Sequence, residues 1–157
     1  MDTLTVDGHR FQLAAATEAD VPALVSLLSD DILGRGRESS ALTPYLSAFR
    51  EIDADDHHLL LCVRDEAGDI VGTIQLTIIP GLARAGARRL QIEAVRLAGT
   101  VRGGGLGSAL FAWAHAYGRG RGATLAQLTS DKARSDAHRF YTRLGYEASH
   151  EGFKRTL

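Results

Sequence analysis

The sequence predicts a single α/β domain. Its 157 residues, of which 45% are hydrophobic, are sufficient for one compact core. Segments with strand-like alternation and segments with helical spacing follow one another, and no repeat, low-complexity tract or linker divides the chain. We therefore expect one domain over residues 1–157, with the element order β–α–α–β–β–β–α–β–α–β–β.

The first half of this order begins with a strand and two helices. The apolar run 10–16 predicts the strand, and helical spacing of apolar residues predicts helices at 17–31 and 41–55. The apolar segments 57–65 and 70–79 flank a turn-like "EAGD" and predict a β-hairpin. The apolar helix faces consist of Val21, Leu24, Val25 and Leu28 in the first helix and Leu42, Leu46 and Phe49 in the second.

The second half alternates strands and helices. The expected segments are a flexible connection at 80–87, a strand at 88–99, a helix from about Gly105 to Tyr117, a strand at 124–130, a helix at 135–146 and a last segment, 146–157, that closes the sheet. In the longer helix, Leu106, Leu110, Trp113 and Tyr117 have the spacing of a core-facing stripe. Ser135 is the expected N-cap of the last helix.

The charge is unevenly distributed along the chain. Residues 1–69 contain 14 acids and 5 bases, whereas residues 70–157 contain 5 acids and 13 bases, for a net charge of −1. The basic half suits a polyanionic ligand, and the acidic half argues against a nucleic-acid partner. The longest uncharged run, 70–83, is too short to span a bilayer, and the first residues lack a signal-peptide pattern. We therefore expect a cytoplasmic protein with no nucleic-acid or membrane partner.

The cysteine and the histidines favour structural roles. The single cysteine, Cys62, excludes a disulfide framework, and its apolar run is typical of a buried structural thiol rather than a reactive one. His57 and His58 are adjacent in a predicted strand, so their side chains point to opposite faces and make a poor chelate. No His, Cys or Asp cluster has the spacing of a zinc site, so no structural metal is expected.

The segment 102–108, "RGGGLGS", places four glycines between a strand and a helix. A Walker P-loop would need a lysine after its last glycine, and a Rossmann turn would need an acid about 20 residues later; the sequence has neither. The segment is therefore either a structural loop or an anion-binding turn. In the second case, bare backbone N–H groups and the positive end of the helix dipole face one ligand, and Arg102 adds a fixed charge.

This segment resembles the Arg/Gln-x-x-Gly-x-Gly/Ala signature of the GCN5-related N-acetyltransferase (GNAT) superfamily. The stretches 10–28 and 136–147, "DAHRFYTRLGYE", are similar to the opening and the late element of the same family. The resemblance covers about 10–157 and implies a GNAT-like fold with a central mixed, mostly antiparallel sheet flanked by about four helices. The stretch 136–154 further resembles the C-terminus of aminoalkylphosphonate N-acetyltransferases.

The resemblance also implies acetyl-coenzyme A (acetyl-CoA) as co-substrate, with its diphosphate on the glycine turn and its pantetheine paired with the backbone of the preceding strand. Arg134 stands where the family often has an asparagine, and an arginine there could reach a phosphate. The implied coenzyme-binding residues are Val95, Leu97, Arg102, Gly103, Gly104, Gly105, Leu106, Gly107, Ser108 and Arg134.

Two residues are candidates for proton transfer. Glu93 is expected to be half-buried in the strand before the glycine turn, where some family members carry the base; it could equally be an ordinary exposed glutamate or a partner of Arg96. By resemblance, Tyr141 meets the coenzyme sulfur and protonates the leaving thiolate, whereas its helical spacing alone is also that of a packing residue. His138, one turn before Tyr141, could line the same pocket or cover the core.

The sequence thus predicts an N-acetyltransferase that acts on a primary amine of a small molecule by direct attack. The alternatives are a catalytically silent acetyl-CoA sensor, a protein or peptide N-acetyltransferase, and a plain interaction domain. The loops 30–40 and 79–89 are the expected substrate loops; their arginines would favour an acidic or phosphonate-bearing amine or would simply be solvated. A homodimer is expected only from the resemblance.

Overall fold

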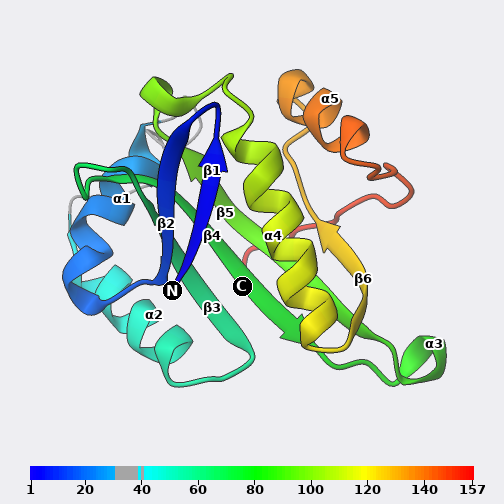
Figure 1. Ribbon diagram of the computed structural model, residues 1–157. Coiled ribbons are helices and arrows are strands. Elements are labelled where there is room, and N and C mark those ends of the chain that lie inside the picture. The colour runs from blue at the N-terminus through cyan, green and yellow to red at the C-terminus, as the bar shows by residue number, and fades with distance from the viewer. Residues whose placement is uncertain (31–38, 40) are drawn as a thin grey trace. The chain divides into compact units, whose positions relative to one another are not determined.

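A computed structural model describes residues 1–30, 39 and 41–157 (Figure 1). The chain forms two compact units, Met1–Gln127 and Leu128–Leu157. The larger unit contains nearly the whole sheet and the glycine turn, and each unit is described by itself below. The expected substrate loop at 30–40 lies almost entirely outside the described residues.

The first unit is built on a six-stranded sheet with the strand order β1-β2-β3-β4-β5-β6. Each of the strands β1 to β5 is antiparallel to its neighbour. A helix, α4, connects β5 to β6, as parallel neighbours require. The predicted mixed, mostly antiparallel sheet is confirmed. The strands are β1 (Asp2–Val6), β2 (His9–Ala15), β3 (His58–Arg64), β4 (Ile70–Ile79), β5 (Arg88–Leu97) and β6 (Ala123–Leu128).

Helices cover both faces of this sheet. The larger helices are α1 (Val21–Ser29), α2 (Thr43–Asp53) and α4 (Leu106–Gly120) in the first unit and α5 (Ser135–Arg143) in the second. Short helical turns are present as η1 (Glu18–Asp20), η3 (Gly99–Val101) and α3 (Ala83–Gly86). The predicted helix at 17–31 is thus η1 followed by α1, and Leu42 of the second predicted helix is exposed rather than buried.

The strand register shows which residues each helix covers. Leu61, Ile74 and Leu90 share one face, and Leu90 lies against Gly118 of α4. Cys62, on the opposite face, belongs to a buried cluster with α1 and α2. The described core residues of that cluster are Ala16, Val21, Leu24, Val25, Phe49 and Cys62. The sheet is therefore enclosed between α4 on one side and the α1–α2 pair on the other.

Several sequence predictions are wrong in detail. Strand β1 was not predicted. Residues 146–157 are predominantly exposed and form no strand, because they lack the apolar alternation that would give them a buried face. The predicted flexible connection contains α3, in which Arg84 and Ala85 have left-handed φ angles of 55° and 57°. Arg134, not Ser135, is the N-cap of α5.

Helix α4 differs from its prediction in its end and its buried face. It continues past Tyr117 to Gly120, and its buried residues are Leu106, Leu110, Phe111, Ala114 and Gly118. Trp113 and Tyr117 are half-buried because they lie beside the core stripe: their rings stack at a centroid distance of 5.6 Å, and Trp113 Nε1 donates to Asp2 Oδ2 at 2.7 Å. They tie α4 to the start of β1.

Among the described residues, none of the helices has the length and apolar character needed to cross a membrane.

Candidate functional site

Strand β5 is bulged immediately before the glycine turn. Glu93 is paired with Gln75 of β4, but the next paired residue, Arg96, stands opposite Thr73. Two residues of β5, Ala94 and Val95, therefore face a single residue of β4, and Ala94 has a left-handed φ of 50°. Such a β-bulge bends its strand and redirects backbone groups away from the ladder.

Beyond the bulge, β5 continues to Leu97. The Gln127 side chain of β6 bonds to Gln91, which precedes the bulge. At the end of β5, the carbonyl of Val95 accepts a hydrogen bond from Arg96 Nη1 at 2.8 Å, and the carbonyl of Leu97 accepts one from Arg102 Nε at 2.8 Å. Each carbonyl oxygen can accept a second bond.

The glycine turn, residues 102–108, has left-handed φ angles at two of its glycines. Gly103 and Gly105 have φ angles of 87° and 84°, and Gly105 is the N-cap of α4. A Cβ on Gly103 would meet nothing within 4 Å, so glycine is required there by conformation and not by crowding. The buried side chain of Leu106 anchors the helix end in the core.

Backbone donors gather at this helix end. The Ala109 N–H donates to the Gly105 carbonyl at 3.1 Å, which is the first i to i−4 bond of the helix. The N–H groups of residues 106–108 precede it and have no intrahelical acceptor. Together with the positive end of a 15-residue helix, they form an arrangement suited to a phosphate group. Arg102 is exposed beside them, and Ser108 is also exposed.

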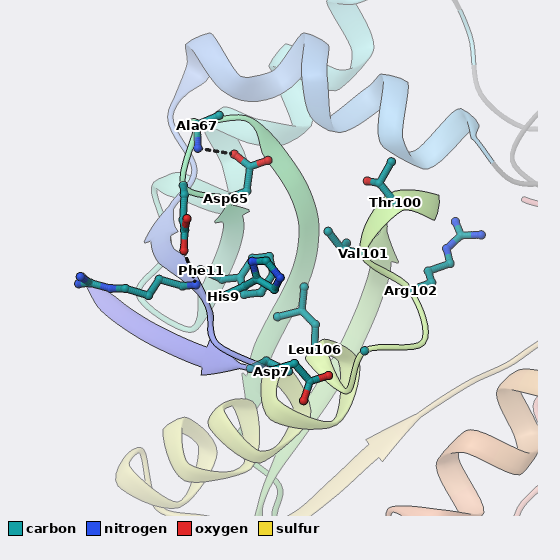
Figure 2. A pocket seen from close by; sticks show the side chains of 13 residues that line it. Asp7, His9, Phe11, Asp65, Ala67, Thr100, Val101, Arg102 and Leu106 are labelled. Atoms are coloured by element: carbon teal, nitrogen blue, oxygen red, sulfur yellow. Dashed lines mark hydrogen bonds between the residues drawn. The ribbon is translucent and has the colours of Figure 1, made fainter.

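A pocket of about 360 Å³ adjoins the turn on the side of the β1–β2 and β3–β4 turns. Figure 2 shows Thr100, Val101 and Arg102 on one wall and His9 and Phe11 of β2 on the other, with the Arg102 guanidinium pointing away from the cavity. Three carboxylates line it, from Asp7, Asp65 and Glu66. Arg10 and Arg102 also line the pocket, so the acids outnumber the arginines by only one, and the backbone N–H groups at the start of α4 remain the better anion site.

Glu93 is exposed, which corrects the expected partial burial. It belongs to a row of side chains that crosses the sheet from Leu60 through Gln75. Leu60 packs against the α1–α2 cluster, whereas Glu93 lies at the other end of the row. Its carboxylate can therefore meet a ligand that approaches this face of the sheet.

Tyr141 and Arg134 belong to the second unit. Tyr141 is half-buried on α5, and its ring makes edge-to-face contacts with Phe140 at 5.5 Å and with Tyr146 at 6.1 Å. Arg134 caps the helix through its carbonyl, which accepts the His138 N–H at 3.0 Å. His138 itself is exposed.

Tyr146 is a residue that sequence reasoning missed. Burial, and then the neighbouring Tyr141, raise the pKa of its phenol to about 12. The sequence places Tyr146 in the "GYE" that ends the family-like stretch 136–147, and this position could have marked it as a candidate. Its spacing, however, does not distinguish it from an ordinary packing residue.

Cys62 has the buried position that the sequence predicts, whereas the prediction that His57 and His58 point to opposite faces is wrong, because both rings lie within 4 Å of the Asp55 carboxylate. Cys62 is 1% exposed, and burial, with a smaller contribution from Asp20, raises its pKa to about 12. His57 Nδ1 lies 2.9 Å from Asp55 Oδ1, and His58 Nδ1 lies 3.0 Å from Thr77 Oγ1. The described residues contain no group of three metal-ligating side chains placed to hold an ion.

The bulged strand, the glycine turn and the helix that follows it define an α/β protein of the GNAT type. Residues 23–146 match the model of the Acetyltransferase (GNAT) family, and the chain belongs to that family.

Individual relatives agree with this assignment. The chain is 38% identical over 100 residues to an aminoalkylphosphonate N-acetyltransferase of Salmonella typhimurium; the match covers 64% of this chain and 63% of that protein's length. It is similar in structure to a transcriptional regulator from Bacillus halodurans (TM-score 0.88, 42% identity, 94% of this chain and 99% of the other). A Trypanosoma brucei acetyltransferase shares the fold (TM-score 0.76, 24% identity, 94% and 99% covered).

Proposed function

We propose that the protein is an acetyl-CoA-dependent N-acetyltransferase that acts on a primary amine of a small molecule. The observation that carries this proposal is the left-handed glycine turn between the bulged β5 and α4, in a chain of the acetyltransferase family. The Salmonella relative, an aminoalkylphosphonate N-acetyltransferase, supports an amine as acceptor. In this proposal, residues 1–157 act as one catalytic domain.

The turn would bind the coenzyme through its diphosphate. The backbone N–H groups of residues 103–108 would donate to phosphate oxygens, and Arg102 and Arg134 would add charge-assisted bonds. The open space at Gly103 supports this fit, because no side chain blocks access to the backbone there. Val95 and Leu97 would pair with the pantetheine amides through backbone groups, as an added strand does.

Transfer to an amine requires a neutral nucleophile. A lysine-like amine with a pKa near ~10.4 costs roughly 4–5 kcal/mol to deprotonate at pH 7, so a base accelerates the reaction. Glu93, exposed on the sheet face, would accept this proton. A backbone N–H redirected by the bulge would stabilise the oxyanion, and Tyr141 would protonate the departing thiolate. The amine attacks the thioester directly, because Cys62 is buried and cannot form an acyl-enzyme.

Release of CoA from acetyl-CoA tests the proposal directly. The panel of acceptors would include aminoalkylphosphonates, polyamines, amino acids, aminoglycosides and a lysine peptide, with and without a divalent metal. Turnover with one small-molecule group is the expected result. Turnover with the lysine peptide alone would instead identify a peptide N-acetyltransferase.

A second candidate is a coenzyme sensor without transferase activity. It is favoured by the similarity to a Bacillus halodurans protein described as a transcriptional regulator. A sensor would be stabilised by acetyl-CoA, by about 2.7 kcal/mol at 100 times the Kd, but would release no CoA with any amine. Stabilisation without release would therefore select the sensor, and the absence of both would eliminate both candidates.

A further inference from the structure

One face of the sheet changes from apolar to polar between β3 and β6. On the face covered by α1 and α2, Cys62 and Leu60 of β3 pack in or against the helix cluster. Further across the sheet, polar side chains replace them at the end of the strands remote from the glycine turn. We refer to these residues, which are His58, Thr77, Gln91, Gln127 and Arg89, as the polar strip.

Hydrogen bonds connect the side chains of the polar strip. His58 Nδ1 lies 3.0 Å from Thr77 Oγ1, and Thr77 is the register partner of Gln91. Gln127 Nε2 donates to Gln91 Oε1 at 2.7 Å, and Arg89 Nη1 donates to Gln127 Oε1 over a longer distance of 3.5 Å. The two glutamines are thus fixed by each other, whereas the guanidinium is held only weakly.

In the described part of the first unit, Arg89 has no acidic partner, in contrast to Arg50 and Arg64. Arg64 and Arg50 each pair with a carboxylate, at 2.6 Å and 2.7 Å. Among the described residues of the first unit, no carboxylate forms an ion pair with Arg89, although the residue is half-buried. An anionic ligand on this face of the sheet would supply a counter-ion to the guanidinium.

Two residues of the strip, Arg89 and Gln91, lie on the same strand and the same face as the proposed base. Glu93 is two residues from Gln91, a distance of about 7 Å along a strand, and four from Arg89. The arginine side chain is long enough to span part of that separation. A ligand whose amine approaches Glu93 can therefore direct a second group toward Arg89.

We infer that Arg89, with Gln127 and Gln91, binds an anionic group of the acceptor, which makes the acceptor a short amine that carries a phosphonate, phosphate or carboxylate. This inference rests on the proposed N-acetyltransferase function. The planar guanidinium offers paired N–H donors to such oxyanions, and its long bond to Gln127 Oε1 leaves most of these donors available to a ligand.

The test uses acceptors of similar length: 2-aminoethylphosphonate, β-alanine and n-propylamine, which lacks an anionic group. Wild-type KM is expected to be lower for an acceptor with an anionic group than for propylamine by about 10- to 100-fold. Arg89→Gln should remove that difference by raising KM for the acceptor with the anionic group, with kcat and acetyl-CoA affinity nearly unchanged, and Arg89→Lys should restore part of it. The comparison of phosphonate with carboxylate identifies the preferred anion.

Arg88→Gln is the matched control. Arg88 is the adjacent arginine, and its Nη1 donates to the Arg121 carbonyl at 3.2 Å, so its loss should leave acceptor selectivity unchanged. Methylphosphonate should also inhibit the wild-type enzyme competitively against 2-aminoethylphosphonate, a measurement that does not depend on how any variant folds.

The outcomes separate the two claims. Equal wild-type KM values for amines with and without an anionic group, or no competition by methylphosphonate, would overturn the role of Arg89 while leaving the transferase activity established. Equal losses in Arg88→Gln and Arg89→Gln would overturn it as well. A wild-type protein that acetylates none of the three amines, nor any other of the panel, would remove the proposed function and this inference with it.

Discussion

Gly118 of α4 lies so close to Leu90 of β5 that a methyl group on the glycine would be 2.8 Å from Leu90 Cδ2. The Leu90 Cβ and Cγ atoms would also be within 3.3 Å of it, and Leu90 is 1% exposed. The side chain cannot swing away without disturbing the core. This contact therefore sets the separation of α4 from the sheet, and α4 begins at the glycine turn.

Gly118→Ala should consequently destabilise the protein. Alanine favours a helix over glycine by about 1 kcal/mol, but overpacking against Leu90 costs about 1–3 kcal/mol, so a net loss is expected in urea denaturation. Gly120→Ala is the control: a Cβ there meets nothing within 4 Å, and stability should be equal or slightly higher. Equal stability of wild type and Gly118→Ala would show that the helix can move away from the sheet.

Gly103→Ala should reduce acetyl-CoA binding more than it reduces stability. Its φ of 87° is strained for alanine by about 1–2 kcal/mol, and the new methyl group would project from the coenzyme-facing turn. Gly68, in the β3–β4 turn, has a similar φ of 89° and equally open surroundings. Gly68→Ala should thus lose comparable stability in urea but retain the acetyl-CoA affinity measured by calorimetry. Equal losses of acetyl-CoA affinity in Gly103→Ala and Gly68→Ala would contradict a role of the glycine turn in coenzyme binding.

Much of the first unit could be predicted from local sequence signals. The hairpin of β3 and β4, strand β5 and the start of α4 follow from alternation, from helical spacing and from the glycines between them. The missed strand β1 also had a signal. Asp7 and Gly8 form the two-residue turn between Val6 and His9, both have positive φ angles, and Asp-Gly is a typical hairpin pair.

Other features depend on tertiary contacts that the sequence does not encode locally. The bulge places Ala94 in a left-handed conformation that alanine disfavours, so no residue type marks it. Trp113 and Tyr117 have core spacing, but they are half-buried because α4 presents Phe111 and Ala114 to the sheet. The exposure of Glu93 likewise depends on how far α1 and α2 extend across the sheet.

Tyr141→Phe should lower kcat by about ten-fold or more with little change in acetyl-CoA affinity, because the variant keeps the ring contacts but removes the proton of the proposed acid. Tyr146→Phe is the matched control. Its phenol has a pKa raised to about 12, which makes it a poorer proton donor than an ordinary tyrosine. Steady-state kinetics should therefore show a smaller effect. A larger loss in Tyr146→Phe would assign the acid to that residue instead.

Cys62 should not react with a disulfide reagent in the native protein. At pH 8, a thiol with a pKa of about 12 is ionised in about one molecule in 10,000, and the side chain is 1% exposed. The reagent should thus report one thiol only after denaturation in guanidinium chloride. Rapid labelling of the native protein would show that the α1–α2 cluster opens readily.

The ion pair of Asp20 with Arg64 should make stability depend on pH. Burial tends to raise the pKa of Asp20, but hydrogen bonds from the Thr17 N–H, from Arg64 at 2.6 Å and from the Thr17 hydroxyl outweigh it, so the pKa lies below its usual value. Because the folded-state pKa is the lower one, the stabilisation is complete above the unfolded-state pKa near ~3.9 and is lost as the pH falls through the folded-state pKa.

Asp20→Asn should therefore lose about 1.5–3 kcal/mol at pH 7, the usual contribution of a hydrogen bond to a charged group, and should show a flatter decline of stability below pH ~4. Urea denaturation at pH 7 and pH 3 measures both effects. Glu18→Gln is the control, because its pair with Arg50 is solvent-exposed and should contribute little. If Asp20→Asn and wild type lost the same stability between the two pH values, other carboxylates would carry the acid sensitivity.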